Sequence, residues 1–219
     1  MSLQPNPLPL FPLGIVLFPD EMVPLHIFEE RYKRLVSDCM RDGTPFGIIL
    51  YEGGKLSQVG CAATIASIER TYEDGRLDIS VVGRDRFRVN TITDDGSYML
   101  SDVDWIEDAT ESADGREVQR LIAQHMKLLE LAGRTVRPEF YEGDGLLSFR
   151  LGRNAGLELA QKQDLLEASS EPDRVALLVG HLEQFIPKVE RFEVVRQKVK
   201  SNGHFSDFPP ENWAHRDDE

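Results

Sequence analysis

The sequence is poor in cysteine, and this shortage excludes two classes of protein. It contains two cysteines, Cys39 and Cys61, in 219 residues, which are too few for a disulfide framework. No CxxC pair is present to indicate a zinc site. Cys39 falls on the apolar side of a predicted helix, and Cys61 falls within a predicted strand. We therefore expect two buried, free thiols.

Basic residues are also scarce. Lys and Arg number 25 against 38 Asp and Glu, so the formal net charge is −13 at pH 7. This sign opposes binding to the nucleic-acid backbone and to anionic membrane surfaces, both of which need clustered positive charge. Nucleic acid is therefore a disfavoured partner, although a local basic patch is not excluded.

Long apolar runs are missing as well. No stretch of about 18 apolar residues predicts a membrane helix. Prolines interrupt the N-terminal region, where a signal peptide would have an unbroken apolar segment. The sequence predicts a soluble, cytoplasmic protein with no membrane association.

Common catalytic motifs are absent from the sequence. There is no G-x-x-x-x-G-K-[ST] phosphate loop, no H-E-x-x-H metal motif and no G-x-S-x-G nucleophile elbow. The five histidines are scattered, and His26, in an apolar segment, is expected to be a hydrogen-bonded structural residue. We predict no catalytic residue, no metal site, no cofactor and no enzyme activity. An uncharacterised hydrolase or peptidase is the alternative left open.

Residues 8–40 are the most informative stretch of the chain. A proline cannot donate to a sheet ladder, so the prolines at positions 9, 12, 19 and 24 divide the first part into short, bent strands. The apolar spacing then becomes helical, and Gly43 supplies a helix end. The predicted inward face of this helix comprises Phe28, Tyr32, Leu35, Val36 and Cys39.

Residues 45–103 predict further short strands joined by tight turns. Segment 45–51 is a continuous apolar run, typical of a buried strand, and apolar residues alternate in segments 59–65, 77–81, 84–89 and 98–103. Asp-Gly turns separate several of these segments, and Gly83 predicts a bulge or a corner. Five or six strands with one helix describe a small mixed barrel, which we place at residues 1–110.

Beyond the strands the pattern becomes helical. Acidic residues dominate positions 102–117, which we interpret as a solvated linker. Helices are predicted at residues 118–129, 146–153, 159–168 and 171–200, the last with a kink or restart at Pro187. They form a helical bundle at residues 111–200 that packs on the barrel.

Residues 201–219 are predicted to form an acidic, flexible tail. They carry five acidic residues against one arginine. Phe205, Phe208 and Trp213 could dock this tail onto the body. The apolar seam of the preceding helix could also support a homo-oligomer.

Several sequence blocks occur in the order found in one known family. They are LPLFPLGIVLFPDEMVPLHIFEERYKRL at residues 8–35, FGII at 46–49, VGCA at 59–62, DGRL at 74–77, GRDRFRV at 83–89, KQDLLE at 162–167 and DRVALL at 173–178. Together they resemble the N-terminal, substrate-recognition domain of the ATP-dependent Lon proteases. The resemblance covers about residues 8–200.

This resemblance implies an α+β fold, with a PUA-like β pseudo-barrel that contains one helix and is followed by a helical bundle. It implies a non-enzymatic protein- or peptide-binding module whose partners are unfolded or degron-bearing client proteins. Lon proteases also need an ATPase and a Ser-Lys protease module, so the chain resembles a free-standing member without them. The family usually has glycine in the turn after Phe18-Pro19, where this chain has Asp20. Aspartate tolerates left-handed geometry, so we expect the turn to persist.

An extended peptide would need a groove lined by aromatic and aliphatic groups. The candidates are Phe11, Phe18, Phe28, Arg31, Tyr32 and Phe87, each of which could equally belong to the core. Arg84 and Arg86 form a positive stripe with Arg88. These arginines could pair with Asp78 or Glu69 across strands, contact a peptide or anion, or bind RNA, since PUA-like barrels also occur in RNA-binding proteins.

Overall fold

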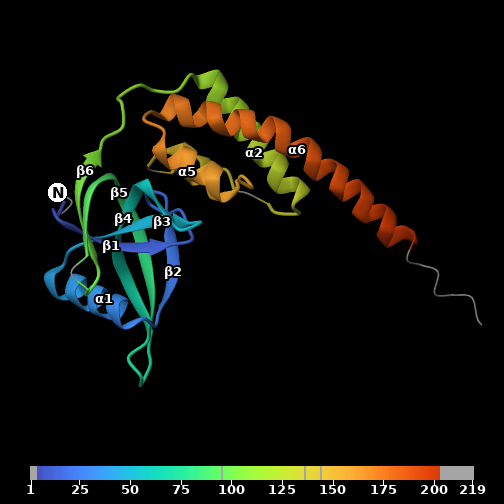
Figure 1. The fold of residues 1–219 in the computed structure, drawn as a ribbon. Helices are drawn as coiled ribbons and strands as arrows, with labels where there is room; N and C mark the ends of the chain where they lie inside the picture. The colour runs from blue at the N-terminus through green and yellow to red at the C-terminus, as the bar shows by residue number, and fades with distance from the viewer. Residues whose placement is uncertain (1–3, 95, 136, 144, 203–219) are drawn as a thin grey trace, which may run out of the picture.

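The computed structural model describes residues 4–94, 96–135, 137–143 and 145–202, with the backbone alone for 196–202. The strands within these residues are β1 (Leu8–Leu13), β2 (Met22–Ile27), β3 (Phe46–Glu52), β4 (Lys55–Thr71), β5 (Leu77–Asp94) and β6 (Met99–Ile106). The helices are α1 (Glu30–Asp42), α2 (Gly115–Leu131), α3 (Glu139–Glu142), α4 (Leu147–Gly152), α5 (Leu159–Glu167) and α6 (Glu171–Asn202). Figure 1 shows α1 against the strands and the other labelled helices on the far side of the sheet. The predicted α+β class is confirmed.

The strands form a sheet that returns on itself. Its order is β2-β5-β4-β3-β1-β6, and β5 also pairs with β6, so the hydrogen bonding forms a ring with β2 outside it. β1 and β3 are parallel, with Phe11 opposite Ile48, whereas the other pairs are antiparallel. A parallel pair needs a long crossover connection, which β2 and α1 provide here. The result is the predicted pseudo-barrel.

The turn before β2 is locked against a bulge in β5. Asp20 has a φ of 58°, the left-handed conformation that aspartate was expected to tolerate. Its N–H donates to the carbonyl oxygen of Gly83 over 3.0 Å, and the N–H of Gly83 donates to the backbone carbonyl oxygen of Glu21 over 2.8 Å. The pairing of β4 with β5 shifts register beside Gly83. The predictions for Asp20 and for a bulge at Gly83 are both confirmed.

Helix α1 begins later than the sequence pattern predicted. Its first residue is Glu30, and its end has Gly43 at a φ of 65°. Tyr32, Leu35, Val36 and Cys39 are buried on its inner face as expected. Phe28 precedes the helix and is 60% exposed, so its assignment to that face was wrong.

In the helical half, α6 is one helix of 32 residues that continues through Pro187. The predicted restart at this proline is therefore not seen. α2 lies beside α6, and the C-terminal part of α6 projects beyond the other elements (Figure 1). No helix in the described part of the chain is long and apolar enough to span a membrane.

The junction between the two halves is not simply a solvated linker. Asp108 accepts hydrogen bonds from Arg86 of β5 and from Arg174 of α6. Arg86 also donates to the carbonyl oxygens of Leu166 at 2.6 Å and Ala168 at 2.7 Å. The linker interpretation of the acidic segment was therefore wrong at Asp108, which fastens the helices to the barrel.

Candidate functional site

A groove opens on the outside of the pseudo-barrel, between β1, the end of β2 and the start of α1. Its volume is about 450 Å³, within the range of ligand-binding clefts. We call it the aromatic groove. It is lined by Phe11, Pro12, Leu13, His26, Ile27, Phe28, Glu29, Arg31, Tyr32, Tyr51, Leu56 and Met99.

The floor of the aromatic groove is a packed pair of rings. Phe11 of β1 and Tyr32 of α1 have ring centroids 4.0 Å apart, and they are 5% and 7% exposed. Burial raises the pKa of Tyr32 above its ordinary value, so its hydroxyl is neutral at physiological pH. The floor is therefore rigid, apolar and uncharged.

The rim of the groove carries the exposed aromatic side chains. Phe28 is 60% exposed and Tyr51 is 50% exposed. Phe28 lies between the last residue of β2 and the N-terminus of α1, so most of its ring stays in solvent. A monomeric protein usually buries large apolar side chains, and exposed ones beside a cleft are typical of binding surfaces.

One cation lies at the groove. The guanidinium of Arg31 is 4.7 Å from the ring centroid of Tyr32, a cation–π distance. Its Nε donates to Glu29 over 3.0 Å, and this hydrogen bond raises the pKa of Arg31. Because Glu29 also lines the groove, the local charge is balanced and the site favours a largely apolar ligand.

A hydrogen-bond network fixes the imidazole at the edge of the groove. His26 Nδ1 lies 2.5 Å from an Asp78 oxygen, and the Tyr72 hydroxyl donates to the other oxygen over 2.8 Å. The bond with His26, followed by that from Tyr72, lowers the pKa of Asp78. The imidazole also stacks against Phe28 at 6.0 Å. His26 has a hydrogen-bonded structural role, as its sequence context predicted.

Half of the predicted binding residues meet in this groove. They are Phe11, Phe28, Arg31 and Tyr32. Phe18 and Phe87 are fully buried, so placing them at a surface was wrong. Phe87 fills the space beside two glycines, Gly47 and Gly60, where an added Cβ would come within 2.5 Å of its ring.

The predicted arginine stripe does not exist as a surface. Arg86 is 3% exposed and belongs to the Asp108 network. Arg84 donates to Thr64 over 2.9 Å, while Glu69 accepts from Ser67 and Ser80. The expected partners Asp78 and Glu69 are thus bonded to other groups. Because Arg86 is buried, the three arginines do not form the concentrated positive surface that RNA binding would need.

Sequence reasoning missed Tyr51, Leu56 and Met99, which complete the groove. They come from the end of β3, the start of β4 and the start of β6. Tyr51 and Leu56 face each other across the tight turn between β3 and β4, whereas Met99 reaches them only through the strand order, which no local pattern encodes. The one available signal was Tyr51, an aromatic residue beside the polar turn that ends a buried strand.

The groups best suited to nucleophilic or metal chemistry are inactive or dispersed. Cys39 is 3% exposed and Cys61 is fully buried. Burial raises the pKa of Cys39 to about 11 and raises that of Cys61 still further, so neither thiol is an activated nucleophile. Among the described residues, no group of three His, Cys, Asp or Glu side chains could hold a metal ion.

Comparison with known families identifies the lineage. The ATP-dependent protease La (LON) substrate-binding domain matches residues 7–184. The chain belongs to this family. The resemblance noted in the sequence is therefore confirmed, and these 219 residues contain no Lon ATPase or protease region.

Full-length Lon proteases match the chain over one part of their own length. The Lon protease of Cytophaga hutchinsonii is 25% identical over 216 residues, which cover 90% of this chain and 26% of that protein. The Lon protease of Escherichia coli K12 is 23% identical over 209 residues, which cover 88% of this chain and 26% of that protein. The chain thus spans about a quarter of the length of these curated relatives.

Solved structures of Lon N-terminal domains have the same fold. The Lon N-terminal domain protein from Xanthomonas campestris is 28% identical, with a TM-score of 0.65 over 80% of this chain and 98% of that one. The N-terminal domain of the Mycobacterium avium complex Lon protease gives a TM-score of 0.61 at 17% identity, over 81% of this chain and 98% of that one. The second likeness concerns the fold alone.

Proposed function

We propose that this chain is a non-enzymatic protein-binding module that holds extended apolar segments of client proteins in the aromatic groove. The observation that carries this proposal is the exposure of Phe28 and Tyr51 above the buried floor of Phe11 and Tyr32. Membership in the Lon substrate-binding family supports it. The buried, protonated thiols weigh against a cysteine nucleophile in the alternative of an uncharacterised hydrolase or peptidase.

Recognition in this groove depends on side chains more than on strand addition. β2 is the strand of the sheet with a single paired neighbour, β5. It contains Pro24 at its centre, and a proline removes a backbone donor from the edge where an added strand would pair. The groove, by contrast, offers apolar walls and few polar groups. An incoming segment would gain affinity by inserting aromatic or aliphatic side chains between Phe28 and Tyr51.

The test is the binding of a fluorescein-labelled unfolded client, β-casein, and of labelled degron peptides, measured by anisotropy and by calorimetry. Saturable binding is expected for the native chain. Phe28→Ser removes an exposed ring without opening a cavity, and it should weaken binding by roughly tenfold or more, as expected for a central aromatic contact.

Met22→Ser is the matched control for Phe28→Ser. Met22 is 63% exposed on β2 and does not line the groove. Its replacement should leave client binding unchanged. Absence of saturable binding, or equal affinities for Phe28→Ser and the native chain, would refute the proposal.

A further inference from the structure

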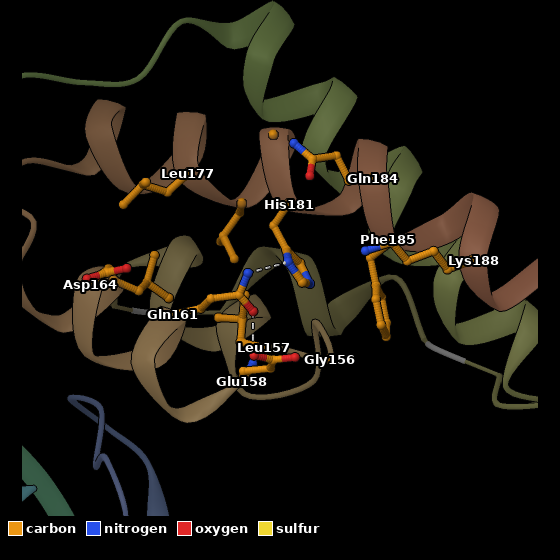
Figure 2. A pocket seen from close by; sticks show the side chains of 13 residues that line it. Gly156, Leu157, Glu158, Gln161, Asp164, Leu177, His181, Gln184, Phe185 and Lys188 are labelled. Carbon is orange, nitrogen blue, oxygen red and sulfur yellow. Dashed lines mark hydrogen bonds between the residues drawn. The ribbon is translucent and has the colours of Figure 1, made fainter. Parts of the chain in front are cut away.

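A second cleft lies between α5 and α6, away from the aromatic groove. Its volume is about 380 Å³. Figure 2 shows Glu158, Gln161 and Asp164 on the α5 side and Leu177, His181, Gln184, Phe185 and Lys188 on the α6 side. We call it the α5/α6 cleft.

A hydrogen-bond chain holds the two walls of the α5/α6 cleft in place. His181 Nε2 lies 3.0 Å from the carbonyl oxygen of Ala155, and its Nδ1 lies 3.2 Å from the amide nitrogen of Gln161. Gln161 Oε1 accepts from the N–H of Glu158 over 2.9 Å. Because a carbonyl only accepts, Nε2 carries the proton and Nδ1 accepts from Gln161. The cleft is therefore a preformed feature with fixed walls.

The α6 wall of the cleft continues beyond the body of the protein. On α6, His181, Phe185 and Lys188 follow Leu177 by four, eight and eleven positions. This is the spacing of residues on one helix face. Phe192 and Val195 follow Leu177 by fifteen and eighteen positions and continue the same face. Their side chains are 74% and 59% exposed. This continuous face, from Leu177 to Val195, is the α6 stripe.

The outer part of the α6 stripe has no cover among the described residues. Glu190 pairs with Lys127 of α2 over 2.6 Å, so Phe192 and Val195 lie close to the end of α2, which is Leu131, before α6 projects beyond the other elements (Figure 1). Helices in proteins are stabilised mainly by packing of their apolar face. With Phe192 and Val195 in water, this helix face is therefore a candidate docking surface for another segment.

Charge indicates what kind of segment fits. Residues 188–200 carry five basic residues and two acidic ones, opposite in sign to the chain as a whole at −13. A covering segment should therefore be acidic and aromatic. Glu158 and Asp164 make the α5 wall of the cleft acidic. Acidic residues of the covering segment would therefore lie along residues 188–200 of α6, and its aromatic residues would lie in the cleft.

Residues 203–219 of this chain have that composition. They lie outside the described residues. Their sequence contains five acidic residues, one arginine, and the aromatic residues Phe205, Phe208 and Trp213. They follow directly on the end of α6 at Asn202.

The connection is long enough for this segment to turn back along α6. An extended chain spans at most about 3.3–3.6 Å per residue, whereas a helix rises about 1.5 Å per residue. Phe208, six residues after Asn202, can therefore reach back about 20 Å, and Phe192 is about 15 Å away along the helix. By the same count Trp213 can reach Phe185 in the α5/α6 cleft.

We propose that residues 203–219 dock on the α6 stripe of their own chain, with Phe208 near Phe192 and Trp213 in the α5/α6 cleft. The docked segment covers the exposed apolar face and neutralises the basic end of α6. This surface is distinct from the aromatic groove, so the proposal stands or fails independently of client binding.

The test uses Trp213 as its own probe. The full chain with Trp105→Phe has Trp213 as its remaining tryptophan, and its fluorescence quenching by acrylamide reports exposure of the indole. Docking predicts quenching several-fold weaker than in the same chain unfolded in urea. Adding Phe192→Ser and Val195→Ser should raise the quenching close to the unfolded value, and high salt should raise it in part.

Val194→Ser is the matched control. Val194 is 53% exposed but lies two residues from Phe192, on the opposite side of the helix. It should leave the quenching unchanged. Quenching of Trp213 equal to that of the unfolded chain, or unaffected by the Phe192→Ser and Val195→Ser pair, would overturn the proposal. Protection that grows with protein concentration would also overturn it, since the segment would then dock on a second copy.

A second measurement needs no change at Trp105. Hydrogen exchange of the α6 amides at residues 188–195 should be slower in the native chain than in the full chain carrying Trp213→Ser and Phe208→Ser. Equal exchange rates in the two proteins would count against docking.

Discussion

Arg86 and Arg174 bind the same carboxylate, that of Asp108, from different halves of the chain. Arg86 lies on β5 in the barrel and Arg174 lies on α6, and they are 3% and 0% exposed. The Arg174 Nη2 is 2.7 Å from Asp108 Oδ2, and Arg86 donates to Oδ1. Both guanidinium groups also lie over the ring of Phe149, at 5.6 and 4.5 Å from its centroid. One anion thus joins the barrel to the helices.

Replacement of Asp108 by asparagine should destabilise the whole chain. Burial lowers the pKa of Arg86, and the charge of Asp108 opposes that effect. Removing the carboxylate leaves the buried Arg86 without this anion, while Arg174 keeps its ion pair with Glu171 at 3.1 Å. Breaking such a pair costs about 3–5 kcal/mol when it is fully buried. Because the Asp108 side chain is 22% exposed, we expect a loss of about 2–4 kcal/mol in the free energy of unfolding, measured by urea denaturation.

Asp104→Asn is the control for Asp108→Asn. Asp104 is an exposed acid on β6, and its replacement changes the net charge by the same amount. It should alter the free energy of unfolding little. Equal stabilities of the two variants would show that the junction does not depend on this anion.

His125 should make the protein sensitive to acid. It is fully buried on α2, and desolvation lowers its pKa from 6.5 to about 4. The unfolded chain therefore takes up a proton at a higher pH than the folded chain, and stability falls as the pH drops from 6.5 toward 4. We expect a loss of about 2 kcal/mol between about pH 7.5 and pH 5 from this group.

The measurement is the free energy of unfolding across this pH range for the native chain and for His125→Phe. The phenylalanine keeps the ring that stacks on Phe140 and removes the titrating group, so the pH dependence should become shallower. A slope that His125→Phe leaves unchanged would contradict the assignment.

Gly83→Ala should destabilise the fold at the turn before β2. A Cβ at position 83 would lie 2.1 Å from the carbonyl oxygen of Phe18, and backbone on both sides of this contact is tied by the hydrogen bonds of Asp20 and Gly83. Since neither segment can move freely, we expect a loss of about 2–3 kcal/mol on urea denaturation. Gly14→Ala, where nothing lies within 4 Å of an added Cβ, should change stability by a few tenths of a kcal/mol at most, and a similar loss at both positions would contradict this account.

The strands and helices that local pattern predicts are largely those of the structure. Alternation found β4 to β6, the continuous apolar run at residues 45–51 found β3, and the helical spacing of Tyr32, Leu35 and Val36 found α1. Family resemblance added the order in which they assemble. The aromatic groove was found only in part, because Tyr51 and Met99 reach it through strand pairings distant in sequence.

Arg86 shows where alternation fails. Its neighbour Phe87 faces the inside of the barrel and is fully buried, so a two-residue period places Arg86 in solvent. The helices cover that outer face, and the carbonyl oxygens of Leu166 and Ala168 replace water around the guanidinium. The alternation in β5 gives no sign that its outer face is covered as well. Phe192 is the opposite case: an apolar residue at core spacing that no described residue buries.

The two thiols should be unreactive in the native state. Cys39 and Cys61 are buried, and desolvation raises the pKa of Cys39 to about 11 and that of Cys61 further. The thiolate is the reactive form, so reaction with Ellman's reagent at neutral pH requires the chain to open first. Single-cysteine variants, Cys61→Ala and Cys39→Ala, report each thiol separately. We expect both to react slowly in buffer and rapidly in urea, with Cys39 the faster of the two in buffer, since α1 can open locally while Cys61 pairs within the sheet. Rapid reaction of either thiol in the native chain would indicate an activated cysteine and would revive the hydrolase alternative.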